Sequence, residues 1–451
     1  MTDPSLLWFR RDLRVADHPA LVEAASRGPV VPLFVLDPAL LGPAGGPRTA
    51  FLFRSLRALD EALGGRLVVR VGDPTDVVPA LAGEVGARAA FVTADFGPYG
   101  RRRDHEVARA LQEAGRKLTG VGSPYAVDPG RVLKTDGTPY RVFSPFYRAW
   151  RAVGWPPPAS DAPPVTWAGG APSDGIPEDP AIEPALPPAG EAAAMTRLVE
   201  FLAGPIDDYA ARRNRPAADA TTRLSPYLKY GCIHPRQILA RLDRSKAHEK
   251  LRSELAWREF YADVLWHTPE SARRSLQPAL AGMELDAGPL ADERFRAWTE
   301  GRTGFPLVDA GMRQLSGEAW VHNRVRMVVA SFLVKDLHID WARGARWFLR
   351  HLVDGDLASN HHGWQWVAGT GTDPAPYFRI FNPVTQGVEH DPDGDYVRRW
   401  VPELVGVAGA AVHEPWKLPG GLPPGYPERI VDHGAERVEA LRRYKELKSD
   451  G

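Results

Sequence analysis

The sequence has a single cysteine, Cys232, among its 451 residues. One thiol cannot form a disulfide within the chain or supply the ligands of an iron–sulfur cluster, so both are excluded for this chain alone. We expect Cys232 to be a small buried hydrophobic residue. Apolar runs of membrane-spanning length are also missing, and the N-terminus has no apolar segment of signal-peptide length. The sequence therefore predicts a cytoplasmic protein without a membrane partner.

The chain also lacks an excess of either charge, because 56 Lys and Arg residues balance 56 Asp and Glu residues and the formal net charge is zero. Nucleic-acid binders usually carry a basic excess, so this balance counts against binding that is wholly electrostatic. A zero net charge is still compatible with a basic surface on one part of the protein. A hydrophobic content of 44% and a charged content of 25% are ordinary for a globular protein, and the length allows two or three domains.

Short apolar runs alternate with amphipathic ones in the first part of the chain. The runs typical of buried parallel strands are residues 5–9, 30–36, 67–71 and 88–92. Helix-like segments lie between them, which predicts an α/β domain with a doubly wound parallel sheet over residues 1–128. Such sheets bind ligands beyond the carboxyl ends of their strands, so we expect a ligand near the turns that follow these strands.

A stretch dense in Pro, Gly and Ala, residues 129–190, follows this domain. It has little periodicity and should cross the surface as an extended interdomain linker. Helical periodicity then returns and strand signals fade. The helical segments include residues 192–204, 250–267, 311–337 and 434–448. We predict one all-α domain over residues 191–451.

Residues 354–383 lack the apolar period of a packed helix or strand. Polar groups alternate there with large aromatic faces, as a site for a flat conjugated ligand requires. The side chains concerned are Asp354, Asp356, Asn360, Trp364, Trp366 and Tyr377. For any one tryptophan taken alone, the alternative is an irregular loop that places the ring in a core.

Two helical segments place chemically active side chains on one face. The first carries, at i, i+3, i+4 and i+7, the residues Glu254, Trp257, Arg258 and Tyr261. An indole offers a stacking surface and a carboxylate accepts N–H protons from a pyrimidine edge, so this face suits a nucleobase. The alternative is an amphipathic helix with a salt-bridged rim. Asn323, Arg326 and Met327 share a face of the second segment, although Met327 alone is more typical of core packing.

Hydroxyl side chains precede a helix within residues 209–231. Thr221, Thr222 and Ser225 stand where the free backbone N–H groups of a helix N-terminus can bind a pyrophosphate. They are equally compatible with plain helix caps.

Residues 354–383 resemble the flavin-binding signature of the DNA photolyase and cryptochrome family in their order, DGDLASNHHGWQWVAGTGTDPAPYFRIFNP. Residues 8–21 resemble the opening motif of that family, WFRRDLRVADHPAL. The likeness extends over nearly the whole chain and is strongest to class I photolyases for cyclobutane pyrimidine dimers. It implies an α/β antenna domain and an all-α FAD-binding domain.

This resemblance implies a deoxyribodipyrimidine photo-lyase, a light-dependent carbon–carbon lyase. Fully reduced FAD, excited directly or through an antenna, passes an electron to a dimer that is flipped out of the DNA; the ring splits and the electron returns. No metal or acid–base triad is required. The partner is DNA that contains pyrimidine dimers, and we expect a monomer without an obligate protein partner.

The resemblance also implies the site residues. Those expected to contact FAD are Tyr209, Thr221, Thr222, Arg223, Leu224, Ser225, Glu254, Trp257, Arg258, Tyr261, Arg326, Asp354, Gly355, Asp356 and Asn360. Those expected to act on the dimer are Glu254, Trp257, Asn323, Met327, Asn360 and Trp366. Those expected to bind DNA are Arg213, Glu254, Trp257, Asn323, Arg324, Trp366 and Gln386. Arg326 is expected to pair with Asp354.

Asn360 matches the family's residue beside flavin N5. A neutral amide can hydrogen-bond N5 without donating a proton to it, which favours the anionic reduced flavin that repair needs. Plant cryptochromes have Asp at this position and animal cryptochromes have Cys. Asn360 therefore favours repair over the rival function, a cryptochrome-type blue-light photoreceptor without repair activity. A third alternative is a colourless nucleotide-binding α/β protein with a helical domain.

The family reduces its flavin through three tryptophans, and Trp364 and Trp341 match the two nearest the flavin. Counting back from Trp298, the third position falls on Gly288. We expect that another aromatic side chain substitutes there or that photoreduction is slow.

The N-terminal domain of the family carries a light-harvesting antenna. Folate-binding relatives have a glutamate where this chain has Gly97, and PYGRRRD is similar to the 8-hydroxy-deazaflavin type. We therefore expect an 8-hydroxy-deazaflavin in contact with Arg48, Phe51 and Asp95. A folate antenna and the absence of any antenna are the alternatives.

Overall fold

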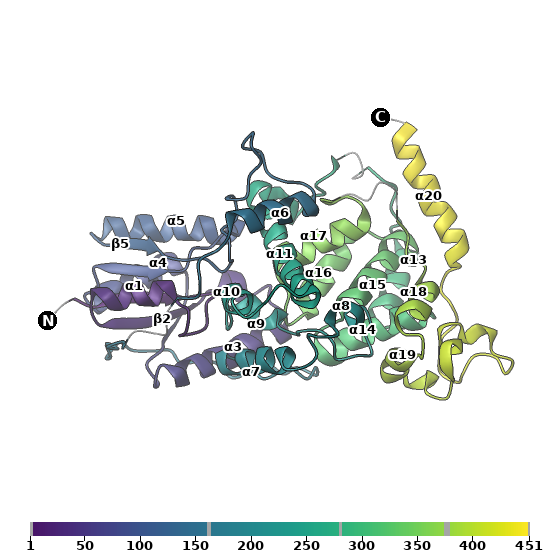
Figure 1. The fold of residues 1–451 in the computed structure, drawn as a ribbon, viewed down its shortest axis with the longest axis horizontal. Coiled ribbons are helices and arrows are strands. Elements are labelled where there is room, and N and C mark those ends of the chain that lie inside the picture. Colours follow the sequence, from purple (N-terminus) through teal and green to yellow (C-terminus); the bar gives the residue numbers. More distant parts are fainter. Residues whose placement is uncertain (1–2, 160–163, 279–281, 374–378, 450–451) are drawn as a thin grey trace. The chain divides into compact units, whose positions relative to one another are not determined.

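The computed structural model describes residues 3–159, 164–278, 282–373 and 379–449. The chain forms two compact units (Figure 1). The sheet unit consists of Met1–Ile182, Pro187–Gly204 and Thr222–Pro269. The helical unit consists of Glu183–Leu186, Pro205–Thr221 and Glu270–Gly451. Residues 374–378, which include Tyr377, lie outside the described residues.

A five-stranded parallel sheet in the order β3-β2-β1-β4-β5 forms the centre of the sheet unit. Its strands are β1 (Ser5–Phe9), β2 (Val30–Leu36), β3 (Val68–Val71), β4 (Ala89–Val92) and β5 (Lys117–Gly120). Leu6 pairs with Val31 on one side and with Ala90 on the other, so β1 is the middle strand. The predicted doubly wound sheet is thereby confirmed. The apolar pattern does not reveal β5, because none of its side chains is buried.

The helices that come from the first part of the chain are α1 (Pro19–Arg27), α2 (Pro38–Leu41), α3 (Gly46–Ala62), α4 (Pro74–Glu84) and α5 (Pro98–Glu113) (Figure 1). Of these, α1, α4 and α5 contact the strands of the sheet. Leu81 of α4 and Leu111 of α5 belong to the same buried cluster as Leu6, Trp8 and Leu33 of the sheet. Alternate strand residues therefore face α4 and α5, and their burial is the main stabilising term of this unit.

The remaining helices of the sheet unit come from later in the chain. They are α6 (Phe143–Val153), α7 (Glu191–Leu202), α9 (Ser225–Tyr230), α10 (Pro235–Leu239) and α11 (Lys246–His267). The Leu13 N–H donates to the Tyr230 carbonyl at 3.1 Å, and Arg236 forms an ion pair with Asp17 at 2.8 Å. Residues 222–269 thus fold with the sheet, whereas the predicted boundary at residue 191 groups them with the later helices.

The predicted linker contains a helix, which corrects its description as wholly extended. Phe143, Phe146 and Trp150 of α6 are buried, and α6 contacts α11. The Trp150 indole N–H donates to the Glu259 carboxylate at 2.6 Å. These aromatic side chains stand at i, i+3 and i+7, a helical period that the Pro-rich composition around them conceals.

The helical unit contains the remaining helices. They are α8 (Tyr209–Arg212), α13 (Pro289–Thr299), α14 (Pro306–Glu318), α15 (Asn323–Lys335), α16 (Trp341–His351), α17 (Leu357–Ala368), α18 (Pro383–His390), α19 (Asp395–Trp400) and α20 (His433–Ser449). Short 3-10 helices are η1 (Pro269–Ala272), η2 (Pro402–Leu404), η3 (Gly409–His413) and η4 (Pro415–Lys417). A single buried cluster joins α13 to α17, with Trp298, Phe332 and Trp364 among its members.

Two helical interpretations from the sequence need correction. Residues 311–337 are not one helix, because Ala319 takes a left-handed conformation with φ of 50° and ends α14. A new helix, α15, begins at Asn323 after His322 caps it. Residues 357–368, in the stretch without a clear apolar period, form α17. Its polar and aromatic residues are buried on several faces, so the usual one-sided period is lost.

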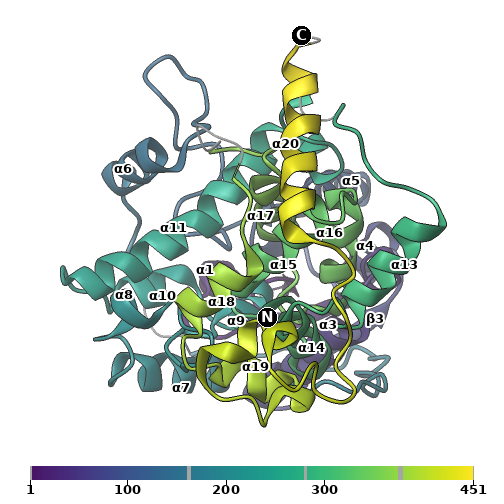
Figure 2. The same cartoon turned by 90° about the vertical axis from the view of Figure 1, so that its right-hand side faces the viewer.

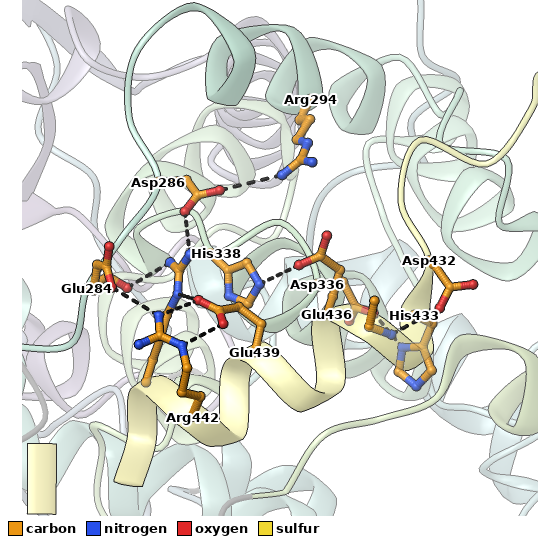
Figure 3. Close-up of polar contacts among 12 residues, drawn as sticks. Glu284, Asp286, Arg294, Asp336, His338, Asp432, His433, Glu436, Glu439 and Arg442 are labelled. Carbon is orange, nitrogen blue, oxygen red and sulfur yellow. Dashed lines mark hydrogen bonds and ion pairs between the residues drawn. The ribbon is translucent and has the colours of Figure 1, made fainter. Parts of the chain in front are cut away.

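The last helix, α20, lies on the helical unit, where it contacts α15 (Figure 2). His433 pairs with the buried Asp336, and the His338 ring lies 2.8 Å from the Glu436 carboxylate (Figure 3). Arg443 forms an ion pair with Asp286 at 2.8 Å. These contacts hold α20 against the residues that follow α15 and against the segment that precedes α13. Within the described residues, none of the helices is long and apolar enough to cross a membrane.

Candidate functional site

A buried carboxylate, Asp354, stands between α16 and α17 of the helical unit. Its Oδ2 pairs with Nη2 of Arg326 at 2.9 Å, and Arg326 also donates to the Val321 carbonyl at 2.7 Å. The predicted Arg326–Asp354 pair is therefore present. Oδ1 of Asp354 is buried and has no hydrogen-bond partner among the described residues. A buried acceptor of this kind costs free energy unless a donor from a ligand or water reaches it.

The start of α17 carries the next two polar residues. Asp356 caps the helix, because its carboxylate accepts from the Ser359 N–H at 3.0 Å. Gly355 precedes it, and its N–H points to the Leu352 carbonyl at 3.4 Å. Asn360 follows one turn later and donates through Nδ2 to the Ala345 carbonyl at 2.9 Å. That bond fixes the amide of Asn360, which is half-buried.

The tryptophans of this region differ in their environment. Trp364 is buried and lies so close to Gly344 that a Cβ on that glycine would stand 2.3 Å from its ring. Gly344 therefore lets α16 approach α17. Trp341 is buried and donates to the Ser275 hydroxyl at 3.1 Å. Trp366 is half-buried, and the Arg379 guanidinium lies 5.8 Å from its ring centre.

Arginines of the helical unit form a local basic cluster around Arg324. Burial lowers the pKa of the Arg324 guanidinium; Glu389 opposes that effect, and Arg213 and Arg379 lower the pKa further. Arg324 donates to the Asn214 side chain at 3.2 Å, while its Nε is buried without a hydrogen-bond partner among the described residues. Cations held together in this way favour an anion such as a phosphate.

Asn323, Met327 and Gln386 lie on the same unit. Asn323 is exposed at the first turn of α15, 4.0 Å from the sulfur of Met327. Gln386 donates to Glu389 at 3.3 Å, and its Oε1 is buried without a partner in the described part of the chain. Tyr209 is buried at the start of α8, and Thr221 is half-buried.

Glu254, Trp257, Arg258 and Tyr261 lie on α11 of the sheet unit, as predicted. Their side chains also contact residues that the sequence pattern does not indicate. Trp257 stacks on Phe143 with ring centroids 3.7 Å apart and 9° between the planes. Glu254 pairs with Lys250 at 3.6 Å, and Tyr261 contacts Trp257 with centroids 5.5 Å apart. One face of the Trp257 indole is therefore occupied within the protein.

Arg258 on the same helix binds protein groups. Its guanidinium donates to the carbonyls of Pro124 and Leu228, both at 3.1 Å, and lies 4.7 Å from the Tyr125 ring centre. These bonds join α11 to the segment after β5 and to α9. The expected contact of Arg258 with FAD stays a prediction.

Residues 222–225 lead into α9 of the sheet unit. The Thr222 hydroxyl accepts from the Leu224 N–H at 3.3 Å, and Arg223 has a left-handed φ of 50°. Leu224 is buried, whereas Ser225 is exposed as the first residue of α9. The hydroxyl of Thr222 thus forms a turn, and the pyrophosphate contacts remain predictions.

The three expected antenna contacts belong to the sheet unit. Phe51 is fully buried between the rings of Tyr227 and Tyr230, with centroids at 5.7 and 5.2 Å. Arg48 is half-buried and donates to the Pro43 carbonyl at 3.2 Å, and its Nε is buried without a partner among the described residues. A ligand could reach Arg48 directly, but it would reach Phe51 only after a side-chain movement.

Asp95, the third expected contact, follows β4 at the carboxyl edge of the sheet. Burial would raise the pKa of its carboxyl, but the nearby arginines, Arg103 first, hold the pKa below its usual range. The distance from Asp95 to Arg103 is 3.3 Å. A Cβ at Gly100 would stand 2.1 Å from Asp95, so only glycine leaves room for this carboxylate.

Several residues with contacts at these positions are not identified by the sequence pattern. Phe143 lies in the predicted linker, and its helical spacing with Phe146 is the signal that could have found it. Arg379 lies within the quoted motif without an assigned role, and the Ala345 carbonyl is a backbone group that no side-chain pattern reveals. In the helical unit, Arg326 and Asp354 form an ion pair close in sequence to the first residues of α17. In the sheet unit, the predicted residues of α11 lie together on one helix.

Comparison with known proteins decides the family. Residues 5–164 match the family model described as DNA photolyase, and residues 251–446 match the FAD binding domain of DNA photolyase. The deoxyribodipyrimidine photo-lyase of Streptomyces griseus is 42% identical, and the match covers 97% of this chain and 98% of that protein. The chain belongs to the DNA photolyase family. The family prediction made from the sequence is confirmed.

Solved structures agree with this membership in the photolyase family. A class III photolyase from Agrobacterium tumefaciens is 37% identical, with a TM-score of 0.89 over 100% of this chain and 98% of that one. A Synechocystis cryptochrome is 28% identical, with a TM-score of 0.87 over 97% of this chain and 98% of that one. The two-part fold of a parallel sheet with a helical FAD-binding domain is thus confirmed.

Proposed function

We infer that this photolyase is a light-dependent deoxyribodipyrimidine photo-lyase that uses FAD to repair pyrimidine dimers in DNA. The observation that carries this is identity over nearly the full length to enzymes of that name, 42% for Streptomyces griseus and 38% for Agrobacterium fabrum. The match to the family's FAD-binding domain supports the cofactor. We propose cyclobutane dimers as the substrate and class I as the subgroup.

The polar groups of the helical unit fit a flavin. Oδ1 of Asp354, which is buried and has no partner among the residues that the structure describes, can accept a hydrogen bond, and flavins carry ring N–H and ribityl O–H donors. Asp356 adds a second carboxylate at the start of α17. When bound, FAD supplies light absorption and one-electron chemistry. The carboxylates would orient it, and the ion pair with Arg326 would hold the Asp354 side chain in place.

Asn360 would hydrogen-bond the flavin edge without transferring a proton to it. Its amide is already oriented by the bond to the Ala345 carbonyl. An amide does not ionise, so it leaves the charge of a reduced flavin unchanged, whereas an aspartic acid could donate a proton. Asn360 is therefore the residue on which the difference between repair and signalling is proposed to depend.

The remaining residues of the helical unit would bind the damaged strand. Arg213 and Arg324 belong to the basic cluster and would contact phosphates, with Gln386 beside them. Asn323 and Met327 would touch the dimer, and the half-buried Trp366 would stack on it. Extrusion of the dimer is aided because a damaged pair stacks poorly. Glu254 and Trp257 are assigned to the same work by resemblance.

We propose an 8-hydroxy-deazaflavin as the antenna. The partly accessible Arg48 and the Asp95 carboxylate among arginines support polar recognition in the sheet unit. The test is the absorption spectrum of protein purified from its native host. A deazaflavin band is expected, and a folate band would overturn the choice.

The function is tested with purified full chain and an oligonucleotide that contains one thymine dimer. Dimers should disappear in blue light and persist in the dark. Asn360→Asp should lower the repair rate and leave DNA binding unchanged. Gln112→Glu, an amide-to-acid change on an exposed position of α5, is the matched control and should repair normally.

A cryptochrome-type photoreceptor is the second candidate, because the Synechocystis cryptochrome shares the fold with a TM-score of 0.87. That function predicts a yellow protein whose flavin responds to light while the dimers persist. A colourless protein would contradict both candidates.

A further inference from the structure

Gly288, the position that matches the third tryptophan of the family, stands directly before α13 with φ of 84°. A residue with a side chain is strained at this φ, so the position favours glycine. Trp298 lies near the other end of α13 and is fully buried. Its indole N–H donates to the Val329 carbonyl at 3.0 Å, which fixes the ring. Thus α13 has a glycine directly before its first residue and a buried tryptophan, Trp298, near its last.

Aromatic rings of the helical unit run without a break from Trp364 toward solvent. Trp298 meets Trp364 edge to face, with centroids 6.1 Å apart and 72° between the planes. Phe295 lies 5.6 Å from Trp298 and 6.0 Å from Trp347, measured between ring centroids. Trp347 is half-buried on α16, so its indole reaches water. Three tryptophans, with Phe295 between the second and third, thus lead from a buried position to the surface.

The charges beside this row of rings are balanced. The Arg343 guanidinium lies 3.9 Å from the Phe295 ring centre and pairs with Asp292 at 2.7 Å. His351 stacks on Trp347 with centroids 4.0 Å apart. Burial lowers the pKa of the His351 imidazole, which keeps it uncharged at neutral pH. A radical cation on Trp347 would therefore not face a second positive charge from this ring.

Trp341 occupies a different branch. It is buried, contacts the His361 ring edge-on with centroids 6.0 Å apart, and donates to Ser275. Its position matches the second tryptophan of the family's relay. The third position of that relay is Gly288, which precedes α13. The row through Trp298 ends instead at a tryptophan that touches solvent.

We propose that Trp298 and Trp347 form the outer part of the electron relay, which delivers electrons from the surface to Trp364 in place of a route through position 288. This rests on the proposed function, because Trp364 gives its electron to a photoexcited flavin. Trp298 then reduces the Trp364 radical cation, and Trp347 reduces the Trp298 radical cation. Trp347 releases its indole N–H proton to water, and the resulting neutral radical takes a hydrogen atom from an external thiol. Two thiyl radicals formed in this way combine to one disulfide.

The relay is tested by transient absorption of the FAD-loaded chain with a thiol reductant. Wild-type protein should form a long-lived tryptophan radical whose decay becomes faster as thiol is added. Trp347→Phe should lose the long-lived radical, since the charge stays on buried Trp298 and recombines. Trp298→Phe should lose it as well. Trp416→Phe, which removes a half-buried tryptophan elsewhere in the same unit, is the matched control and should behave like wild type.

A second readout locates the exposed end of the relay without measuring repair. After illumination in air without thiol, peptide mass spectrometry should find oxidation at Trp347, and Trp298→Phe should prevent it. Far-UV circular dichroism identifies a variant that fails to fold. If a tryptophan variant does not fold, Phe295→Leu is used instead. It keeps every tryptophan and should shorten the radical lifetime, because it removes the ring between Trp298 and Trp347. Wild-type radical yield in Trp347→Phe would overturn the relay, whereas absence of any flavin response in wild type would overturn the proposed function.

Discussion

Two groups of charged side chains, one in each unit, differ in how their charges are matched. At the carboxyl edge of the sheet, Asp104 pairs with both Arg10 and Arg103. Asp12 accepts from the Thr93 hydroxyl at 2.6 Å and lies 3.1 Å from Nε2 of His18. Arg10 and Arg103 thus each have a carboxylate beside them. In the helical unit, Arg324 is half-buried; burial lowers its pKa, Glu389 opposes that effect, and Arg213 and Arg379 lower the pKa further.

This comparison distinguishes charges that stabilise the fold from charges that are available to a ligand. A buried charge with a partner within the chain stabilises the fold and has little capacity left for a ligand. A half-buried cation near two other cations and one carboxylate is only partly compensated in the free protein, and a bound phosphate would complete the compensation. The zero net charge of the whole chain therefore does not exclude a local basic cluster, and it does not report on DNA binding.

The largest expected effect comes from breaking the matched cluster with Asp12→Asn. Asp12 is fully buried; burial would raise the pKa of its carboxyl, but His18 and the hydrogen bonds it accepts hold that pKa well below its usual range. We expect the substitution to lower the free energy of unfolding by about 3 kcal/mol, because a buried partner loses its counter-charge. Urea unfolding at neutral pH measures this.

The same variant has a predicted pH dependence. The pKa of Asp12 is lower in the folded than in the unfolded state, so its contribution is present above the unfolded value of about 4 and is lost as the pH falls below it. The difference between wild type and Asp12→Asn should therefore shrink in acid. Glu23→Gln, which breaks the exposed pair with Arg27, is the control and should cost under about 1 kcal/mol. Equal costs would refute the distinction.

A smaller effect is expected on α20, where neighbouring arginines differ in burial; Figure 3 shows Arg442 among the glutamates near it. Arg443 is buried and donates to the Glu284 carbonyl at 3.1 Å and to Asp286 at 2.8 Å. Arg443→Gln should lower the free energy of unfolding by about 1–3 kcal/mol, because the charged hydrogen bonds are lost. Arg442→Gln, at an exposed site with three glutamates near it, should leave the unfolding midpoint unchanged. A larger loss in Arg442→Gln would contradict the role of burial.

The smallest effect on stability, and the one specific to DNA, is expected for Arg324→Gln. The slope of log affinity against log salt should decrease in magnitude by about 0.7–0.9, as for one lost phosphate contact. Arg313→Gln is the matched control, because Arg313 pairs with Glu403 at 2.7 Å in the same unit. It should lower stability and leave the salt slope unchanged. The same slope in wild type and Arg324→Gln would remove the basic cluster from the DNA interface.

The sequence predicts local structure well where one period dominates. Residues 5–9 and 30–36 form β1 and β2 with the predicted bounds, because continuous apolar runs of that length suit buried parallel strands. The prediction fails for α6 and α17, where the buried face is aromatic or polar. The cytoplasmic location, the monomeric state and the roles of the individual site residues stay predictions.

The sequence by itself determined the family, the sheet and the residue types of the candidate site, because these depend on local periodicity and on the order of motifs. Only the tertiary structure decided which partner each side chain has. Phe143 covers one face of Trp257, the Ala345 carbonyl orients Asn360, and Trp298 stands beside Trp364. Such contacts join residues that are distant in the chain, and their distances depend on how whole helices pack.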